Sequence, residues 1–265
     1  MLPIFYNESF FYNSIITYTV YLIMPSKPKQ TTNISSNNDM INFYSHKDIQ
    51  KHLPQYDNPH YEQTQILIPA RIGVIASSGG GKTQWLLNFI AKTNDTWGHI
   101  HVVYKTSEPL YEFLTDKLKG KNITFYTKLA DLPQPNDFPH KDKQQLVVFD
   151  DQVNEKNQDI IKELMIRGRK IGKGLTMCYL SQSFFKIPKI VRLQFSHLIL
   201  LKLSSNRDLN LILSDYSLGV NREELANIYK DATGDKFHFL KISIDEPDNN
   251  KKFSHNWTDF YSVEV

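Results

Sequence analysis

A glycine-rich run followed by a lysine and a threonine is the first place where side-chain types suggest chemistry. Residues 75–83 read Ile-Ala-Ser-Ser-Gly-Gly-Gly-Lys-Thr. Glycines let the backbone turn tightly and point its N–H groups at an anion, and a helix starting at Lys82 adds the positive end of its dipole. In such a phosphate-binding loop Lys82 reaches the β- and γ-phosphates and the Thr83 hydroxyl holds Mg²⁺. We therefore expect a nucleotide to be bound by Ser78, Gly79, Gly80, Gly81, Lys82, Thr83 and Gln84.

One position departs from the GxxxxGK[ST] pattern of these loops, because Ala76 stands where the first glycine is expected. Alanine disfavours a positive φ but fits if the backbone is still extended at that point. An ordinary glycine turn before a helix is the alternative interpretation. The apolar run before the loop and the helical pattern after it favour a phosphate site.

Two adjacent acids follow a second apolar run, Leu-Val-Val-Phe at residues 146–149. An apolar run without alternation is typical of a parallel strand covered on both faces, and ligands bind at the carboxyl ends of such strands. Asp150 then fits the acid that holds Mg²⁺ beside a phosphate loop, and Asp151 is placed to orient an attacking water. Either acid alone would also suit a solvated loop. Their pairing with the upstream glycine loop favours the metal and catalytic roles.

Positive charge is concentrated between Lys162 and Arg192. This segment holds eight basic residues and one acid, a net charge of +7, whereas the whole chain carries +3. Three interpretations of this segment remain open. DNA phosphates would be contacted by Lys173, Lys186, Lys189 and Arg192. Alternatively, Arg167 or Arg169 would contact the nucleotide bound by a neighbouring subunit, or the segment is simply a solvated face.

Apolar runs and helical patterns alternate along the chain, which predicts βαβ units and an α/β fold with a mainly parallel sheet between two layers of helices. Expected strands cover residues 66–75, 99–104, 123–126, 146–151, 175–180, 197–203 and 237–244. Expected helices cover residues 45–53, 82–92, 107–118, 157–167, 184–192, 206–216 and 221–229. Ser107 is expected to cap its helix and Gly120 to end it.

Composition is that of a folded protein, with 40% hydrophobic and 22% charged residues. The single cysteine, Cys178, excludes an internal disulfide framework. Residues 1–40 are expected to be a disordered or misannotated N-terminal tail and linker, and residues 41–265 one P-loop ATPase domain. The first 23 residues are either a tail or an upstream extension of a gene that starts at Met24. The apolar stretch at 15–24 is too short to cross a bilayer, and no basic segment precedes it as in a signal peptide, so no membrane role is expected.

Four motifs together resemble the genome-packaging ATPases of large double-stranded DNA viruses and virophages, which belong to the HerA/FtsK superfamily. They are IASSGGGKT, LVVFDD, RGRK and LSQSFFKIPKIVR. The resemblance covers about residues 65–245. The first motif is shared by many families, and the Ser-Gln-Ser segment with its following Ile-Pro and Val-Arg is the specific part.

The resemblance implies a P-loop NTPase fold of the ASCE, RecA-like type. Lys82 and Thr83 match the family's nucleotide and Mg²⁺ residues, and Asp150 and Asp151 match its acidic pair. Gln182 matches the polar residue that senses the γ-phosphate from a strand lying between the other two. Arg167 and Arg169 fall in the family's Arg-Gly-Arg stretch. Departures are Ala76 for Gly, Lys170 where His is common, and Gln194 where Asn is common.

The function implied by the resemblance is ATP hydrolysis coupled to moving double-stranded viral DNA into a capsid. Its implied partners are DNA, capsid proteins and further copies of the chain in a ring, in the virion or in a viral factory in the host cytoplasm. The alternatives are a DNA translocase or helicase of a plasmid or mobile element, a small-molecule kinase, and an assembly factor that binds ATP without hydrolysing it.

Overall fold

The structure is a computed structural model, and it describes residues 41–118 and 122–263. The chain divides into two compact units, residues 1–53 and 54–265. In the first unit the 3-10 helix η1 (Phe43–Ser45) and the short helix α2 (Lys47–Gln50) bury no side chain. The expected tail and linker at 1–40 lie outside the described residues. The division of the chain at residue 40 therefore stays a prediction.

The second unit is built on one sheet, which has nine strands within the described residues, in the order β3-β2-β4-β5-β1-β6-β7-β8-β9. The six strands from β3 to β6 are parallel, whereas β7, β8 and β9 continue the sheet antiparallel. In chain order the strands are β1 (Arg71–Ile75), β2 (His99–Val103), β3 (Ile123–Tyr126), β4 (Gln145–Asp150), β5 (Leu175–Ser181), β6 (His197–Leu200), β7 (Leu240–Ser243), β8 (Phe253–His255) and β9 (Asp259–Phe260).

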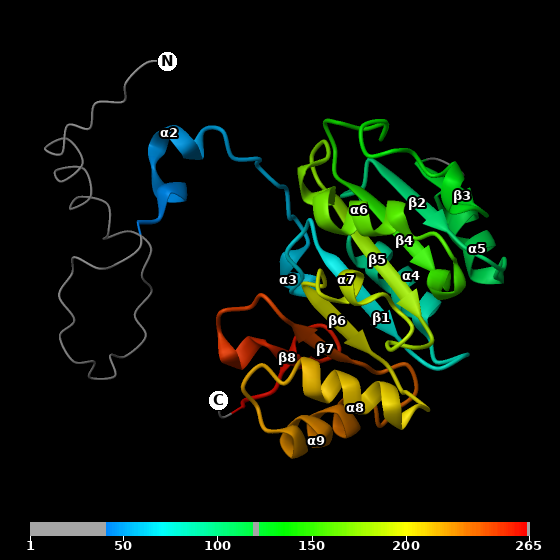
Figure 1. Cartoon of the computed structure of the whole chain (residues 1–265), viewed down its shortest axis with the longest axis vertical. Helices are drawn as coiled ribbons and strands as arrows, with labels where there is room; N and C mark the ends of the chain where they lie inside the picture. The colour runs from blue at the N-terminus through cyan, green and yellow to red at the C-terminus, as the bar shows by residue number, and fades with distance from the viewer. Residues whose placement is uncertain (1–40, 119–121, 264–265) are drawn as a thin grey trace, which may run out of the picture. The chain divides into compact units, whose positions relative to one another are not determined.

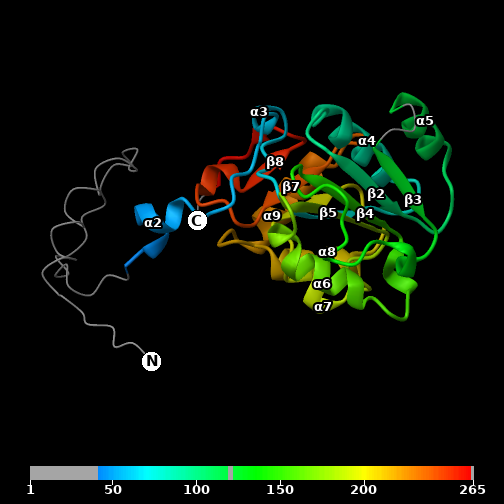
Figure 2. The ribbon, with the colours of Figure 1, turned by 90° about the horizontal axis from the view of Figure 1, so that it is seen from above.

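Helices cover both faces of this sheet (Figures 1 and 2). One face carries α4 (Lys82–Lys92) and α5 (Pro109–Lys117), and the other carries the helices between β4 and β7. Those are α6 (Asp159–Arg167), α7 (Lys189–Arg192), α8 (Asn206–Asp215) and α9 (Arg222–Ala232). Shorter elements are α3 (Tyr61–Thr64), η2 (Leu129–Asp131), η3 (Gln152–Asn154), η4 (Gly168–Lys170) and η5 (Asn249–Lys251).

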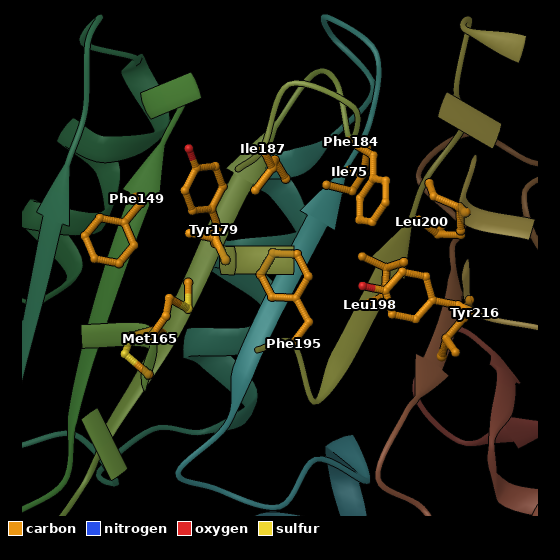
Figure 3. Close-up of a cluster of buried hydrophobic side chains, with 14 of the residues drawn as sticks. Ile75, Phe149, Met165, Tyr179, Phe184, Ile187, Phe195, Leu198, Leu200 and Tyr216 are labelled. Carbon is orange, nitrogen blue, oxygen red and sulfur yellow. The ribbon is translucent and has the colours of Figure 1, made fainter. Parts of the chain in front are cut away.

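Two apolar cores hold these layers together. Residues alternate across β1, so that Ile75 faces the core under α6 to α9 while Ile72 and Val74 face the core under α4 and α5. In Figure 3, side chains from β4, β5, β1 and β6 point to the same side of the sheet and meet Phe184, Ile187 and Phe195 from the segment that joins β5 to β6. A sheet covered on both faces explains the continuous apolar runs of the sequence.

Cys178 lies at the centre of β5, in register with Val148 of β4 on one side and Ile72 of β1 on the other. Its side chain is fully buried, and burial raises the pKa of the thiol well above its usual range. Within the described residues no helix is long and apolar enough to cross a membrane.

The predicted α/β class and mainly parallel sheet are confirmed, but several boundaries differ. β1 begins at Arg71 rather than at residue 66, because Pro69 has no N–H to donate and Ala70 donates to the Thr176 side chain. The strand expected from Phe237 begins at Leu240, since Phe237 adopts a left-handed conformation with φ 69°. The helix expected over 184–192 is only α7, and the strand expected to end at residue 203 ends at Leu200.

At the remaining ends, α5 begins at Pro109 with Glu108 as its N-cap, so Ser107 is not the cap. Gly120 lies outside the described residues. The helix expected over 45–53 is only the four residues of α2. Strands β8 and β9 were not predicted at all.

Candidate nucleotide site

The loop between β1 and α4 has the backbone conformation of a phosphate cradle. Gly79 and Gly81 have φ of 67° and 100°, which side chains rarely allow. A Cβ on Gly81 would also lie 2.7 Å from the Phe237 ring. Ala76 is not among the residues with positive φ, and its N–H donates to the Ser181 carbonyl at 3.2 Å. Alanine is therefore accommodated where the pattern expects glycine, because the backbone there is still paired to β5.

Lys82 and Thr83 begin α4 and are nearly buried, at 9% and 7% exposure. Neither side chain makes a hydrogen bond to a described residue. The positive charge of Lys82 instead stabilises the ionised carboxylate of Asp150, and so opposes the rise that burial causes in the pKa of that residue. Ser78 and Gly79, in the loop, and Gln84, in the first turn of α4, are exposed. The loop thus presents an ammonium group, a hydroxyl and exposed backbone at one helix N-terminus, an arrangement that suits an anion.

Asp150 ends β4 and is nearly buried. Burial raises the pKa of its carboxyl to about 6, although a hydrogen bond from Tyr111 lowers it. The Tyr111 hydroxyl, from α5, donates to Asp150 Oδ2 at 2.6 Å. This contact fixes the carboxylate orientation before any ligand arrives.

Asp151 follows with a left-handed backbone, φ 48°. Gln182, directly after β5, donates its Nε2 to Asp151 Oδ2 at 2.9 Å. The other oxygen, Oδ1, is buried and has no hydrogen-bond partner among the described residues. Because β5 lies between β4 and β1, Gln182 stands between the acids and the phosphate loop, as the resemblance implied. Glu155 nearby in the chain is engaged by Lys105 in an ion pair.

The two candidate arginines do not join this group within one chain. Arg167 ends α6 and pairs with Glu163, while Arg169 lies on η4. The glycine between them packs against Met177 and Leu175, in the amino half of β5, whereas the acids lie at the carboxyl ends of the strands. Arg167 and Lys170 instead line a separate cavity of about 350 Å³.

The four candidate DNA contacts differ in exposure. Lys186 and Lys189 are exposed before and at the start of α7. Arg192 is held inward, with its guanidinium 4.9 Å from the Phe184 ring centroid and 3.9 Å from Asp215. Lys173 lies before β5, where it donates to the Gln55 carbonyl. Lys186 and Lys189 are thus the members of this set whose charge is most available to a partner.

The segment after Gln182 is anchored by α8, a contact that the sequence did not reveal. Asp208 Oδ1 accepts from the Ser183 hydroxyl at 3.2 Å and from the Phe185 N–H at 2.8 Å. The Arg207 guanidinium lies 3.5 Å from the centroid of the Phe185 ring. Asp208 is itself buried. The two partners are separated by more than twenty residues, and only the fold brings them together.

A cavity of about 590 Å³ opens on the other side of the loop, next to β6. No sequence pattern indicates this cavity, because its walls come from three distant segments. It is lined by Ser77, Ser78, Gly79, Gly80, Lys202, Leu203, Ser204, Gly234, Asp235, Lys236 and Phe237.

A family model described as Poxvirus A32 protein matches residues 60–245. Among solved structures, the genome packaging NTPase B204 of Sulfolobus turreted icosahedral virus 2 in complex with ATP-gammaS is similar to this chain, with 16% identity and a TM-score of 0.50 over 72% of this chain and 98% of that one. The same protein in complex with sulfate gives 16% identity and a TM-score of 0.50 over 72% and 97%. At this identity the likeness shows a shared fold. No curated protein matches the chain.

Proposed function

This chain belongs to the Poxvirus A32 protein family, and on that premise we propose that it is an ATP-hydrolysing motor that moves double-stranded viral DNA into a capsid. The family agrees with the viral packaging ATPases that the sequence motifs resemble. The B204 structures, described as a genome packaging NTPase, support the same reading through their fold.

The observation that carries the proposal is the meeting of five side chains at one edge of the sheet. Lys82 and Thr83 lie on α4, Asp150 ends β4 and Asp151 follows it, and Gln182 follows β5. A cradle for phosphate beside paired acids is the equipment of phosphoryl transfer, which depends on positioning and electrostatics. An ordinary glycine turn would not explain why the Gln182 amide fixes one oxygen of Asp151.

The residues present fit a magnesium ion. Thr83 offers a hydroxyl without a hydrogen bond to described residues, and Asp150 a carboxylate already oriented by Tyr111. The described residues contain no group of three His, Cys, Asp or Glu side chains suited to a metal. The remaining ligands would therefore come from phosphates and water, as Mg²⁺ commonly prefers. When bound, Mg²⁺ neutralises charge that develops on the phosphate oxygens.

Asp151 is the residue that we assign to the attacking water. Its Oδ1 is buried and without a protein partner among the described residues, so a water would satisfy it. Gln182 holds Oδ2 and so aims the carboxylate. Lys82 would pair with the phosphates. Gln182 would break its hydrogen bond to Asp151 and form one to the γ-phosphate as hydrolysis proceeds.

The proposal extends to assembly and partners. Because Arg167 and Arg169 lie away from the acids of their own chain, we propose that one of them completes the site of the next subunit in a ring. Lys186 and Lys189 are exposed and would meet DNA phosphates, with Lys173 and Arg192 in supporting positions. Capsid proteins would be the docking partners, in the virion or in a viral factory in the host cytoplasm.

The decisive experiment is ATP turnover by the purified chain with and without double-stranded DNA. We expect phosphate release that DNA stimulates, abolished in Lys82→Ala because the variant loses the charge that pairs with the phosphates. Lys92→Ala, at the far end of the same helix, is the matched control and should keep turnover. ATP binding without turnover in either condition would instead support a non-hydrolysing assembly factor, and DNA-independent phosphate transfer to a small acceptor would support a kinase.

A further inference from the structure

We propose that the cavity beside β6 binds the nucleoside half of the nucleotide, with Phe237 stacked on the base and Asp235 accepting the ribose hydroxyls. This inference rests on the proposed function, because it needs the phosphates to lie over the loop at residues 78–83.

The sheet order fixes which side of the loop is left for the nucleoside. β1 lies between β5 and β6. Gln182 and the two acids stand on the β5 side, so the γ-phosphate end of a nucleotide points there. The cavity stands on the β6 side, and it shares four residues of the loop, from Ser77 to Gly80, as one wall. A nucleotide whose phosphates cross the loop toward the acids therefore places its other end in this cavity.

Phe237 has the properties of a stacking residue. It is 47% exposed, and the Lys236 ammonium lies 4.8 Å from the centroid of its ring. Its φ of 69° is an uncommon conformation for a bulky residue, and such strain often accompanies a binding role. One edge of the ring lies against Gly81, at the first turn of α4. The ring is thus held beside the phosphate loop by the loop's own glycine.

Asp235 is the residue that would accept hydrogen bonds from the ribose. It is the single acid among the described residues that line the cavity, and its side chain is 85% exposed. A carboxylate repels phosphate but accepts hydrogen bonds from neutral hydroxyls, so ribose is its suitable partner. The lining includes no asparagine, glutamine or histidine that would read the edge of a base. Stacking tolerates any base, and we therefore expect ATP and GTP to bind within a few-fold of each other.

The test compares two ligands, ATP and inorganic tripolyphosphate, by titration calorimetry with Mg²⁺. Phe237→Ala should weaken ATP binding roughly tenfold, as loss of one base-aromatic stack does, and leave tripolyphosphate binding unchanged. Phe113→Ala is the matched control, because Phe113 is 51% exposed and also lies under a lysine, Lys117, but on α5. It should change neither affinity.

Asp235→Asn should reduce the preference for ATP over 2′-deoxy-ATP. Phe237→Trp should retain ATP affinity and add a fluorescence component that ATP quenches and tripolyphosphate does not, a readout that does not depend on the alanine variant folding well.

Unchanged ATP affinity in Phe237→Ala, or an equal loss for both ligands, would overturn the nucleoside assignment. If the unaltered protein bound neither ligand, the proposed function itself would fail.

Discussion

Asp150 carries a carboxylate that the proposed metal binding would need ionised, and its buried surroundings resist ionisation. Its pKa is raised to about 6 by burial, and the Tyr111 hydroxyl partly offsets that rise by stabilising the charged form. Activity that depends on ionised Asp150 should therefore appear as the pH rises through about 6. The acid limb of the pH profile reports this residue.

Replacing Tyr111 with phenylalanine should move that limb to higher pH. The variant loses the hydrogen bond that lowers the Asp150 pKa, so a higher pH is needed to ionise the carboxylate. The measurement is kcat/KM for ATP between about pH 5 and 9. Tyr104→Phe is the control, because its ring packs beside Tyr111 but its hydroxyl contacts no carboxylate among the described residues. A limb that stays in place or moves to lower pH would show that Asp150 does not govern it.

Asp151→Asn should bind ATP normally and hydrolyse it at least about 100-fold more slowly. The amide keeps the size of the side chain but cannot accept a proton from the attacking water. ATP affinity by calorimetry and single-turnover phosphate release separate the two effects. Near-normal turnover would show that another acid positions the attacking water. Glu155 is the nearest in sequence, although Lys105 already engages it.

At this scale, local spacing in the sequence indicates candidate residues, whereas contacts that depend on the fold leave no pattern in the sequence. Lys82 and Thr83 are identified by their place after three glycines, and Asp150 by its place after an apolar strand. Tyr111, Asp208 and Phe237 carry no such signal. Each contacts a residue that is distant in the chain, so only the packed structure reveals the contact.

Among the elements, helix α8 holds the β5–β6 connection next to Gln182, the proposed γ-phosphate sensor, through contacts to the residues that follow it. Asp208, in the first turn of α8, binds Ser183 and Phe185, which follow Gln182. The Ser205 side chain caps the same turn by accepting from the Asp208 N–H. The position of Gln182 therefore depends on the N-terminus of α8.

Asp208→Ala should lower the free energy of unfolding by about 2 kcal/mol, because two part-buried donors lose a charged acceptor. It should also reduce kcat more than ATP affinity, since the turn that carries Gln182 is released. Asp215→Ala, at the other end of α8, removes only a half-exposed carboxylate 3.9 Å from Arg192 and should cost less than about 1 kcal/mol. Urea unfolding of both variants measures the difference; equal losses would mean that Asp208 has no special role in the turn.

Some elements were predicted within one residue, whereas others differ by several residues or were not predicted. The strand at residues 123–126 and the helix at residues 82–92 match, because an apolar run and a helical apolar face end there without ambiguity. Strands β8 and β9 have three and two residues and no measurable periodicity. β8 pairs with the open edge of β7, and β9 then pairs with β8, so both strands depend on the sheet rather than on a pattern in their own segment.

The whole molecule places the proposed hydrolytic residues at the carboxyl ends of the strands and its two candidate arginines toward the amino ends. In the proposed motor, this division would leave each site incomplete unless another copy supplied a cation. An arginine provided by a neighbour can raise turnover about 10³-fold or more, and its planar fork suits phosphate oxygens better than lysine does. The geometry is therefore compatible with the proposed ring.

Mixing two inactive variants tests that division. Arg169→Ala, or Arg167→Ala, should bind ATP yet hydrolyse it poorly, and Lys82→Ala should not hydrolyse it at all. Mixed together, they should regain part of the activity, because some interfaces would pair an intact loop with an intact arginine. The readout is ATP turnover across mixing ratios, with each variant alone as its control. Mixtures no more active than the separate variants would place the arginines' role within one chain or on DNA.

The burial of Cys178 has a practical consequence for watching such a motor work. The chain has no other cysteine, and this thiol is fully buried in the middle of β5 with a raised pKa. Maleimide reagents react with exposed thiolates, so the natural protein should remain unlabelled. A cysteine introduced on an exposed helix would then be the unique attachment point for a dye or a tether. Single-molecule recordings could therefore use the native sequence directly, without first replacing its cysteine.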